Sequence, residues 1–312
     1  MYLITTITLN PSLDLNIYVD KLRKNQNNRS KSMKYDIGGK ATHVSLVLST
    51  LDIENKATGI MGGNNGKTII KMMENRNVNC DFVFQEGDET RITYIIVQQE
   101  EEGTFMLTEP GFRIESKTFE ALKKKVKEIV RKDDFVVISG GIPPGIDIWN
   151  YGDLLNLIKE IGGRLIIDTS GECLKEAVKH KPYLLKPNEV ELSQIIGYVP
   201  NSLEEYIKEL KLLNKKGIEI VALSLGDKGS IISTIDKSFR IIPPKVVQIN
   251  DTGCGDVFLG GAVAMLYENR ALEDVFRFAT AISASKATKP GTSEFSLEDA
   301  EKFRKETEIY DV

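Results

Sequence analysis

The chain has 312 residues, of which 41% are hydrophobic and 28% are charged, and its formal net charge is −4. This length and composition are typical of a globular protein with one large α/β domain, or with one such domain and a small appendage. The acidic balance and the lack of long Lys/Arg runs argue against nucleic acid or a membrane surface as a partner.

The N-terminus and the cysteines bear on the compartment. Residues 1–9 are too short and too polar for a signal peptide or a membrane span, and they are typical of a buried strand. Cys80, Cys173 and Cys254 are widely spaced and odd in number, which favours reduced thiols in a cytoplasmic protein over a disulfide framework. With only two histidines and no paired cysteines, a zinc site is not expected.

Two regions alternate polar and apolar residues, a pattern that predicts strands with one solvated face. The first covers about residues 12–36 and includes a polar loop at 24–32, and the second covers about 88–109, with hairpin arms predicted at 91–97 and 103–107. Neither region has a helix between its own strands. We therefore expect a small sheet that stands apart from the main body and acts as a lid over a cleft.

The rest of the chain alternates helical segments with apolar strands. Helices are predicted at 41–51, 67–76, 117–131, 148–161, 171–179, 202–216, 254–287 and 296–306, strands at 135–139, 165–168, 183–186 and 219–224, and hairpin-like pieces at 230–249. The helix at 202–216 is expected to open with a capping box at 202–205. Continuous apolar strands that alternate with helices are typical of a mostly parallel sheet covered by helices on both faces. The predicted fold class is therefore α/β, as a single domain over residues 1–312 with the small β lid.

Polar residues follow four of the predicted strands, beginning at Ser139, Asp168, Lys186 and Ser224. In open parallel sheets the binding crevice lies beyond the carboxyl ends of the strands. These four strand ends favour a site at that edge, although turn residues are also expected wherever a strand leads into a helix.

The stretch at 250–256 carries the strongest chemical signal, because it precedes an apolar helix rich in small residues. Gly253 and Gly255 allow a tight turn, so that backbone N–H groups can point into one space at a helix start that favours anions. Asp256 adds a carboxylate at the same place. This combination suits phosphoryl transfer to a hydroxyl group, with Asp256 as the general base. The ordinary alternative is a first-turn carboxylate that complements the helix dipole, beside packing glycines.

Two other nucleotide-binding motifs are absent. The first strand runs into Asn10-Pro11 where a dinucleotide fold requires Gly-x-Gly-x-x-Gly. Residues 62–68 have three residues, not four, between the first Gly and Gly-Lys-Thr, and they do not directly follow an apolar strand of convincing length. We interpret them as a turn into the helix at 67–76, with Lys67 in solvent.

Seven motifs occur in order along nearly the full chain: TLNPSLD (8–14), GGK (38–40), ETR (89–91), SGGIPPG (139–145), KPNEVEL (186–192), SLGDKG (224–229) and DTGCGD (251–256). Each is weak alone, but together the sequence resembles the ribokinase-like (PfkB) carbohydrate kinases, and within them the 1-phosphofructokinase and tagatose-6-phosphate kinase branch. The resemblance implies a ribokinase-like fold and a kinase that uses ATP and Mg²⁺ to convert a ketohexose monophosphate to a bisphosphate.

The resemblance also implies roles for individual residues. Asp256 would be the catalytic base, and the N–H groups of Gly253, Cys254 and Gly255 would form the anion hole. The residues implied to bind the sugar phosphate are Asp14, Gly38, Gly39, Lys40, His43, Arg91 and Gly141. Those implied to border the nucleotide are Lys186, Asn188, Ser224, Gly226, Gly229, Thr280 and Ser283. Asn188 and Glu191 would order Mg²⁺ through water.

Ordinary interpretations stand beside three of these roles. Asp14 could be a turn-stabilising residue, and Arg91 could form a surface salt bridge. Asn188 and Glu191, three residues apart on a helix start, could simply cap the helix.

The chain departs from the family pattern at two positions. His43 stands where the family has an Asn that contacts sugar or phosphate, and it could contact phosphate when protonated or donate one hydrogen bond when neutral. Cys254 replaces the common Ala or Ser. A thiol at a helix N-terminus suggests a lowered pKa and sensitivity to oxidation, and the alternative, which we favour, is a small buried residue.

Two other functions remain open at this point: a kinase of a neutral sugar or nucleoside, and a non-catalytic sugar-phosphate sensor on the same fold. Arg91 and Lys40 argue against the first, because a neutral sugar offers two cations little to pair with. Asp256 argues against the second, because a sensor needs no base. The expected partners are small molecules and a second copy of the chain, which would form a homodimer through the lid's apolar face.

Overall fold

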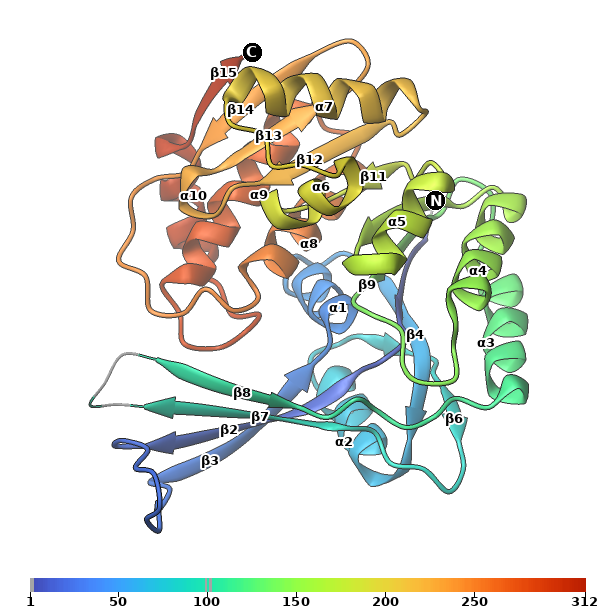
Figure 1. Cartoon of the computed structure of the whole chain (residues 1–312), viewed down its shortest axis with the longest axis vertical. Coiled ribbons are helices and arrows are strands. Elements are labelled where there is room, and N and C mark those ends of the chain that lie inside the picture. The colour runs from blue at the N-terminus through green and yellow to red at the C-terminus, as the bar shows by residue number, and fades with distance from the viewer. Residues whose placement is uncertain (1–2, 99, 101–102) are drawn as a thin grey trace.

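The computed structural model describes residues 3–98, 100 and 103–312 of the chain. A large sheet runs through the main body, and a smaller sheet projects from one end of it (Figure 1). The strand order in the large sheet is β15 (Glu308–Asp311), β14 (Ser238–Ile242), β13 (Ser230–Ser233), β12 (Ile220–Ser224), β11 (Leu184–Leu185), β10 (Arg164–Asp168), β9 (Phe135–Ser139), β1 (Ile4–Thr8), β4 (Asn55–Gly62) and β5 (Asn79–Cys80), with β6 (Val83–Gln85) also paired to β4. Pairing is parallel from β12 to β5 and antiparallel among β12, β13, β14 and β15.

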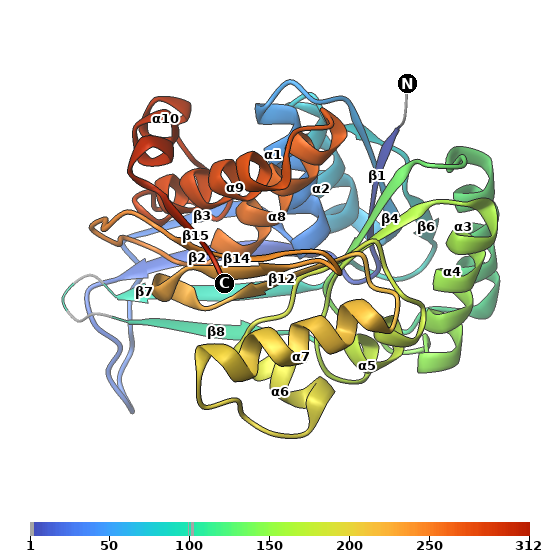
Figure 2. The same ribbon diagram turned by 90° about the horizontal axis from the view of Figure 1, so that it is seen from above.

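Helices cover both faces of the large sheet, as Figure 2 shows from above. One face packs against α3 (Ser116–Ile129), α4 (Ile148–Ile161), α5 (Gly171–Lys179), α6 (Glu189–Ile196) and α7 (Leu203–Lys215). The other packs against α1 (Lys40–Thr50), α8 (Cys254–Tyr267) and α9 (Leu272–Ala287), with α2 (Gly63–Glu74) and α10 (Leu297–Glu306) beside them. A 3₁₀ turn, η1, spans Gly226–Lys228. The predicted fold class, a mostly parallel sheet covered on both faces with a small separate sheet, is confirmed.

The small sheet has the order β3 (Ser32–Gly38), β2 (Ser12–Val19), β7 (Ile92–Gln98) and β8 (Thr104–Thr108). β2 pairs antiparallel with β3 and parallel with β7, and β7 and β8 form the expected antiparallel hairpin. β2, β7 and β8 lie within the ranges predicted for the lid, and β3 extends two residues past the first range. Residues 99 and 101–102 of the second range lie outside the described residues. Whether this sheet acts as a lid stays a prediction.

The two faces of the small sheet differ in polarity. Residues paired directly across strands share a face, and one face carries Leu15, Ile17, Met33, Tyr35, Tyr94, Ile96, Phe105 and Leu107. The opposite face carries polar residues such as Asp14, Thr93 and Thr108, which line the main cleft. The polar face therefore borders the cleft, and the apolar face points away from it.

One sequence interpretation is wrong. Residues 62–68 do follow a strand, because β4 is buried along almost its whole length and pairs with β1. Ala57 and Gly59 in its middle are of residue types that are depleted in strands, which weakens the sequence signal. The helix after it, α2, begins at Gly63 rather than at 67, and Lys67 is exposed as expected.

Smaller differences concern element ends. The stretch 230–249 contains the hairpin β13–β14, but its second half has no strand, and β15, β5 and β6 were not predicted. At the start of α7, Ser202 accepts the Glu205 N–H, whereas the Glu205 carboxylate bonds to the N–H of Asn201 instead of closing the predicted box. Residues 1 and 2 of the predicted first strand lie outside the described residues. In the part of the chain that the structure describes, no helix has the length and apolarity needed to cross a membrane.

Candidate active site

A cleft of about 580 Å³ lies between the carboxyl edge of the large sheet and the polar face of the small one. Its floor includes residues at the ends of five parallel strands: Thr8, Ser139, Asp168, Lys186 and Ser224. Such an edge is where open parallel sheets bind ligands. The volume falls within the roughly 300–1,000 Å³ that is usual for small-molecule sites.

The cleft brings together most of the residues singled out from the sequence. Those that line it are Asp14, Gly39, Lys40, His43, Arg91, Gly141, Lys186, Asn188, Ser224, Gly253, Gly255 and Asp256. Those that do not line it are Gly38, Cys254, Glu191, Gly226, Gly229, Thr280 and Ser283. Of the second group, Thr280 is buried on α9, and Ser283 donates a hydrogen bond to the Cys254 carbonyl oxygen at 2.9 Å.

Sequence reasoning left several lining residues unassigned. They are Thr8, Asn10, Ser12, Thr93, Met106, Thr108, Ser139, Gly140, Asp168 and Thr252. Ser139 and Asp168 were among the polar strand ends that favoured a site at this edge, but no individual role was assigned to them from the sequence. Thr93 and Thr108 could have been found from strand alternation once Asp14 was placed on the same face.

The N-terminus of α8 supplies free backbone donors. In the described residues, the N–H groups of Gly253, Gly255 and Asp256 have no hydrogen-bond partner, whereas the Cys254 N–H donates to the Asp251 carbonyl oxygen at 3.0 Å. The prediction that Cys254 contributes to an anion hole is therefore not supported by this geometry. Free N–H groups and the positive end of a helix dipole favour an anion, so an anion site beside the Asp256 carboxylate stays a prediction.

Gly253 is required for this turn. Its φ is 86°, a left-handed conformation that strains most other residues, and a Cβ added there would overlap the carbonyl oxygen of Thr292. The backbone at Thr292 therefore packs directly against the start of α8. Only glycine at 253 allows this close approach at a position that lines the cleft.

Asp256 does not stand alone. It is 6% exposed, and its Oδ2 lies 2.7 Å from Nδ1 of His43 on α1. The other ring nitrogen, Nε2, lies 2.8 Å from the Ile37 carbonyl oxygen. Both nitrogens of His43 thus have protein partners, which leaves neither for the substrate contact expected from the sequence.

Asp168 holds two lysines at the floor of the cleft. Its Oδ1 lies 3.4 Å from Lys40 Nζ, and its Oδ2 lies 3.3 Å from Lys186 Nζ. Burial would lower the pKa of Lys40, but the Asp168 and Asp256 carboxylates outweigh it and raise that pKa above its ordinary value. Lys40 therefore carries a positive charge into the cleft at neutral pH.

Asp14 and Arg91 approach the cleft from the small sheet. Asp14 lies within β2, not in a turn, and accepts a hydrogen bond from Ser12 Oγ at 2.7 Å. Burial raises its pKa more than this bond lowers it. Gly38 packs against the Asp14 side chain, and a Cβ on residue 38 would overlap the Asp14 carboxylate.

The Arg91 guanidinium is oriented by backbone carbonyls. Nε and one terminal nitrogen donate to the Asn10 carbonyl oxygen at 3.3 and 3.1 Å, and the other terminal nitrogen donates to the Glu109 carbonyl oxygen at 3.1 Å. Because guanidinium carries five N–H donors, two remain for a ligand. The guanidinium is therefore held by these carbonyl oxygens and not by the surface salt bridge that was the ordinary interpretation of Arg91.

Asn188 and Glu191 form a full capping box at the start of α6. The Asn188 side chain accepts the Glu191 N–H at 2.8 Å, and the Glu191 carboxylate accepts the Asn188 N–H at 2.9 Å. Burial is the main cause of a raised Glu191 pKa. The capping role is therefore real, and a role toward a metal ion stays a prediction.

Cys254 fits the interpretation that we favoured from the sequence, a small buried residue. It is partly buried, and burial raises the pKa of its thiol, more than nearby Lys286 lowers it. The lowered pKa suggested by its place at a helix N-terminus is wrong. The thiol is therefore poorly suited to rapid oxidation.

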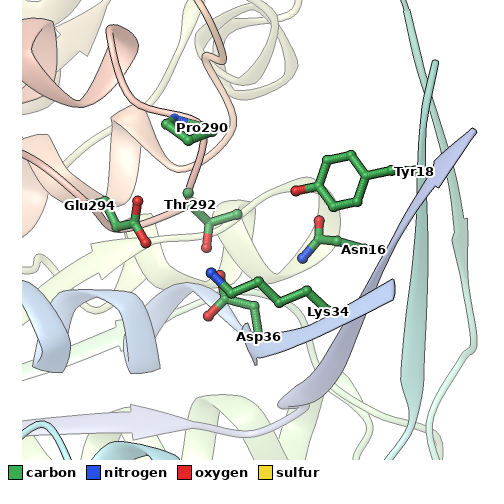
Figure 3. Close-up of a pocket in the computed structure, with 8 residues that line it drawn as sticks. Asn16, Tyr18, Lys34, Asp36, Pro290, Thr292 and Glu294 are labelled. Atoms are coloured by element: carbon green, nitrogen blue, oxygen red, sulfur yellow. The ribbon is translucent and has the colours of Figure 1, made fainter. Parts of the chain in front are cut away.

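A second hollow lies between the small sheet and the 290–294 segment (Figure 3). Lys34 and Asp36 approach it from β3, opposite Thr292 and Glu294. Its volume of about 50 Å³ has room for water but not for a sugar or a nucleotide. Of these two hollows, only the main cleft has room for a sugar and a nucleotide.

Comparisons with known proteins agree with this geometry. A family model described as "pfkB family carbohydrate kinase" matches residues 7–300. The chain is 30% identical over 311 residues to a 1-phosphofructokinase from Borreliella burgdorferi, covering 99% of each protein. It is 29% identical over 313 residues to a tagatose-6-phosphate kinase from Staphylococcus epidermidis, covering 99% of this chain and 100% of the other. It also resembles the tetrameric inhibited form of phosphofructokinase-2 from Escherichia coli, with a TM-score of 0.92 and 26% identity over 98% and 99% of the two chains.

Proposed function

The chain belongs to the pfkB family of carbohydrate kinases, and from that premise we propose that it transfers the γ-phosphoryl group of ATP to a hydroxyl group of a ketohexose monophosphate. The product is a sugar bisphosphate. One observation carries the proposal: a carboxylate and free N–H groups meet at one end of a cleft whose opposite wall presents an arginine with two unused donors.

The reaction follows from the positions of these groups. The acceptor hydroxyl oxygen bonds to the γ-phosphorus while its proton passes to Asp256. The bond from the γ-phosphorus to the β–γ bridging oxygen breaks, and its electron pair leaves with ADP. The N–H groups of Gly253 and Gly255 stabilise the charge on the transferring phosphoryl oxygens. Asp256 afterwards releases the proton to solvent.

The floor of the cleft suits a nucleotide with Mg²⁺. Mg²⁺ prefers oxygen ligands and keeps several waters, so it needs no closed protein cage. In the described residues no three His, Cys, Asp or Glu side chains gather as direct metal ligands. The Asp168 carboxylate is paired with Lys40 and Lys186 and lies near enough to Glu191 to raise the pKa of that carboxyl, so the two carboxylates place oxygen atoms at the floor that a hydrated ion could contact. We propose that Glu191, Asn188 and Asp168 order the ion's water shell, and the bound ion would neutralise phosphate charge.

The polar groups around this floor are proposed to border the nucleotide. They are Lys186, Ser224, Gly226, Gly229, Thr280 and Ser283. Lys186 and Ser224 line the cleft, which supports the proposal most directly.

The three free cysteines support the cytoplasmic location expected from the sequence.

The test is ADP release from ATP with six acceptors: fructose 1-phosphate, tagatose 6-phosphate, fructose 6-phosphate, free fructose, ribose and adenosine. We expect a high kcat/KM for one phosphorylated ketose, and loss of turnover when EDTA removes Mg²⁺ and its return when Mg²⁺ is added. Turnover with only a neutral acceptor would reject the substrate class. No turnover with any of the six would favour a sugar-phosphate sensor.

Arg91 is the proposed recognition group for the substrate's own phosphate. Arg91→Ala is expected to raise KM for the phosphorylated sugar by roughly 10–100-fold, the range for a lost charge-assisted hydrogen bond, with a smaller effect on KM for ATP. Arg91→Lys keeps the charge but loses the planar fork, so its KM should lie between the two. Initial rates against both substrates give the answer, and equal losses for sugar and ATP would remove Arg91 from the acceptor site.

The apolar face of the small sheet is proposed to pair with a second copy of the chain. Met33, Tyr35, Phe105 and Leu107 on that face are between 51% and 60% exposed, an unusual grouping for a surface. The E. coli relative, whose inhibited form is a tetramer, supports association in this family.

Leu107→Asp should convert the dimer to a monomer, because a charge in an apolar interface is costly to desolvate. Leu212→Asp, at a 40% exposed leucine on α7, is the matched control and should leave the dimer intact. Light scattering at micromolar concentration measures both. A monomeric unsubstituted protein would reject the interface.

A further inference from the structure

A buried contact joins His43 to Asp256 and fixes where their protons are. His43 is 5% exposed and Asp256 is 6% exposed, so no bulk water mediates between them. The Ile37 carbonyl oxygen can only accept a hydrogen bond, so Nε2 of His43, at 2.8 Å, must carry a proton. The 2.7 Å contact between Nδ1 and Asp256 Oδ2 then needs a second proton, because two lone pairs would repel at that distance.

The pair therefore holds one shared proton and has no net charge. The proton lies on Nδ1, as an imidazolium beside a carboxylate, or on Oδ2, as an acid beside a neutral imidazole. Burial would lower the pKa of His43, but the hydrogen bond and charge of Asp256, the Ile37 carbonyl and the Asp14 carboxylate together raise it to about 9. At neutral pH the imidazolium form is favoured.

We propose that His43 is a positioning residue for the base, which holds Asp256 Oδ2 by a donated hydrogen bond and leaves Oδ1 for the acceptor hydroxyl, and that phosphoryl transfer requires this one-proton form of the pair. The inference rests on the proposed function of Asp256. It implies that the histidine at position 43, where the family has an Asn, orients the catalytic base and does not contact the sugar.

The step balances in charge and protons. As the acceptor oxygen bonds to phosphorus, its proton passes to Asp256 Oδ1. The His43–Asp256 pair then carries one positive charge beside the newly transferred phosphoryl group. Release of that proton to solvent restores the uncharged pair before the next turnover.

Loss of the shared proton breaks the hydrogen bond between His43 and Asp256. A neutral His43 keeps its Nε2 proton on the Ile37 carbonyl, so its Nδ1 presents a lone pair to a charged carboxylate. Repulsion moves the carboxylate and misplaces the base. Activity should therefore be constant from neutral pH up to the pKa of His43 and fall as pH rises through about 9.

Other charged groups surround the pair and must be separated from it. Asp14 on β2, Lys40 on α1 and Cys254 on α8 interact with the pair directly, and Asp36 on β3 and Arg91 before β7 interact with Asp14. The pKa of Lys40 is raised by Asp168 and Asp256 despite its burial, and burial raises that of Cys254. A variant at position 43 is therefore needed to assign an alkaline loss of activity to the histidine.

The first experiment observes the ring directly. The chain has only one other histidine, His180, which contacts Glu176 on α5, outside the residues that line the cleft. In His180→Gln protein, ¹⁵N-labelled histidine reports His43 alone, and kinase activity should be unchanged. We expect both ring nitrogens to be protonated at pH 7.5, with Nδ1 losing its proton near pH 9. A neutral ring at pH 7.5, or titration near the ordinary value for histidine, would overturn the proposal.

The second experiment is the pH profile of kcat for three proteins. Unsubstituted protein should lose activity above about pH 9. His43→Asn places an amide donor where Nδ1 lies but cannot titrate, so it should keep kcat within roughly tenfold at pH 7.5 and lose the alkaline limb. His43→Leu removes the donor and should lower kcat by roughly 10–100-fold, with little change in KM. Thermal unfolding of each variant checks that it is folded.

The outcomes separate the two proposals. An alkaline limb that persists in His43→Asn protein, or a His43→Leu effect confined to KM, overturns the positioning role while the kinase activity stands. A doubly protonated ring in a protein that phosphorylates none of the six acceptors overturns the proposed function, and the catalytic role of the pair with it.

Discussion

Replacing Asp256 with Asn should lower kcat by roughly 10²–10⁴-fold, the usual contribution of a positioned general base. The amide matches the carboxylate in shape and can meet His43 Nδ1 by accepting through its oxygen or donating through its NH2 group, so the fold and the cleft should survive. What is lost is the capacity to take the acceptor proton. KM for both substrates should change little, because the effect belongs to the transition state.

Glu268→Gln is the matched control for this substitution. Glu268 follows the opposite end of the same helix, α8, and pairs with Arg270 on the surface, away from the cleft. It removes one carboxylate from the chain without touching the reaction, so kcat should be unchanged. Near-normal turnover by Asp256→Asn protein, measured beside this control, would remove Asp256 from the role of base.

Gly253→Ala should produce the second large effect, a loss of roughly 10²–10³-fold in kcat, which is typical for removal of one anion-hole donor. The added Cβ would overlap the Thr292 carbonyl oxygen and would strain a backbone with φ of 86°. The turn before α8 must shift to relieve this, and the N–H groups of residues 253 and 255 then point away from the phosphoryl oxygens. Steady-state rates and thermal unfolding measure the two consequences separately.

Gly197→Ala separates backbone strain from loss of the anion hole. Gly197 ends α6 with φ of 89°, but a Cβ there would meet no atom within 4 Å. This control should cost about 1 kcal/mol of stability and leave kcat unchanged. If Gly253→Ala behaves like Gly197→Ala, the anion hole does not depend on the conformation of residue 253.

The sequence was most informative where the fold depends on local patterns. Continuous apolar strands such as 135–139 and 165–168 need both faces buried, which is typical of a parallel sheet covered by helices, so the fold class could be predicted. Strand alternation placed a small sheet at the correct regions. β4 was missed because Ala57 and Gly59 have low strand propensity, although Gly59 fits the close approach of the Thr8 backbone in the sheet.

The site was predictable as a set of residues but not as a set of contacts. Polar strand ends and the glycine turn identified most of the groups that line the cleft. The His43–Asp256 hydrogen bond joins residues 213 positions apart and leaves no periodic trace in the sequence. The same holds for Arg91, whose partners are backbone carbonyls that any residue type would supply.

The central claim is that this chain phosphorylates a sugar that already carries a phosphate. The most direct measurement is ³¹P NMR of the reaction of protein, ATP and Mg²⁺ with each ketohexose monophosphate, with Asp256→Asn protein as the blank. Two phosphate monoester resonances from a single sugar, growing in step with ADP and absent from the blank, are the expected result. ADP accompanied only by inorganic phosphate, or a phosphoester formed only on an unphosphorylated acceptor, would contradict the account.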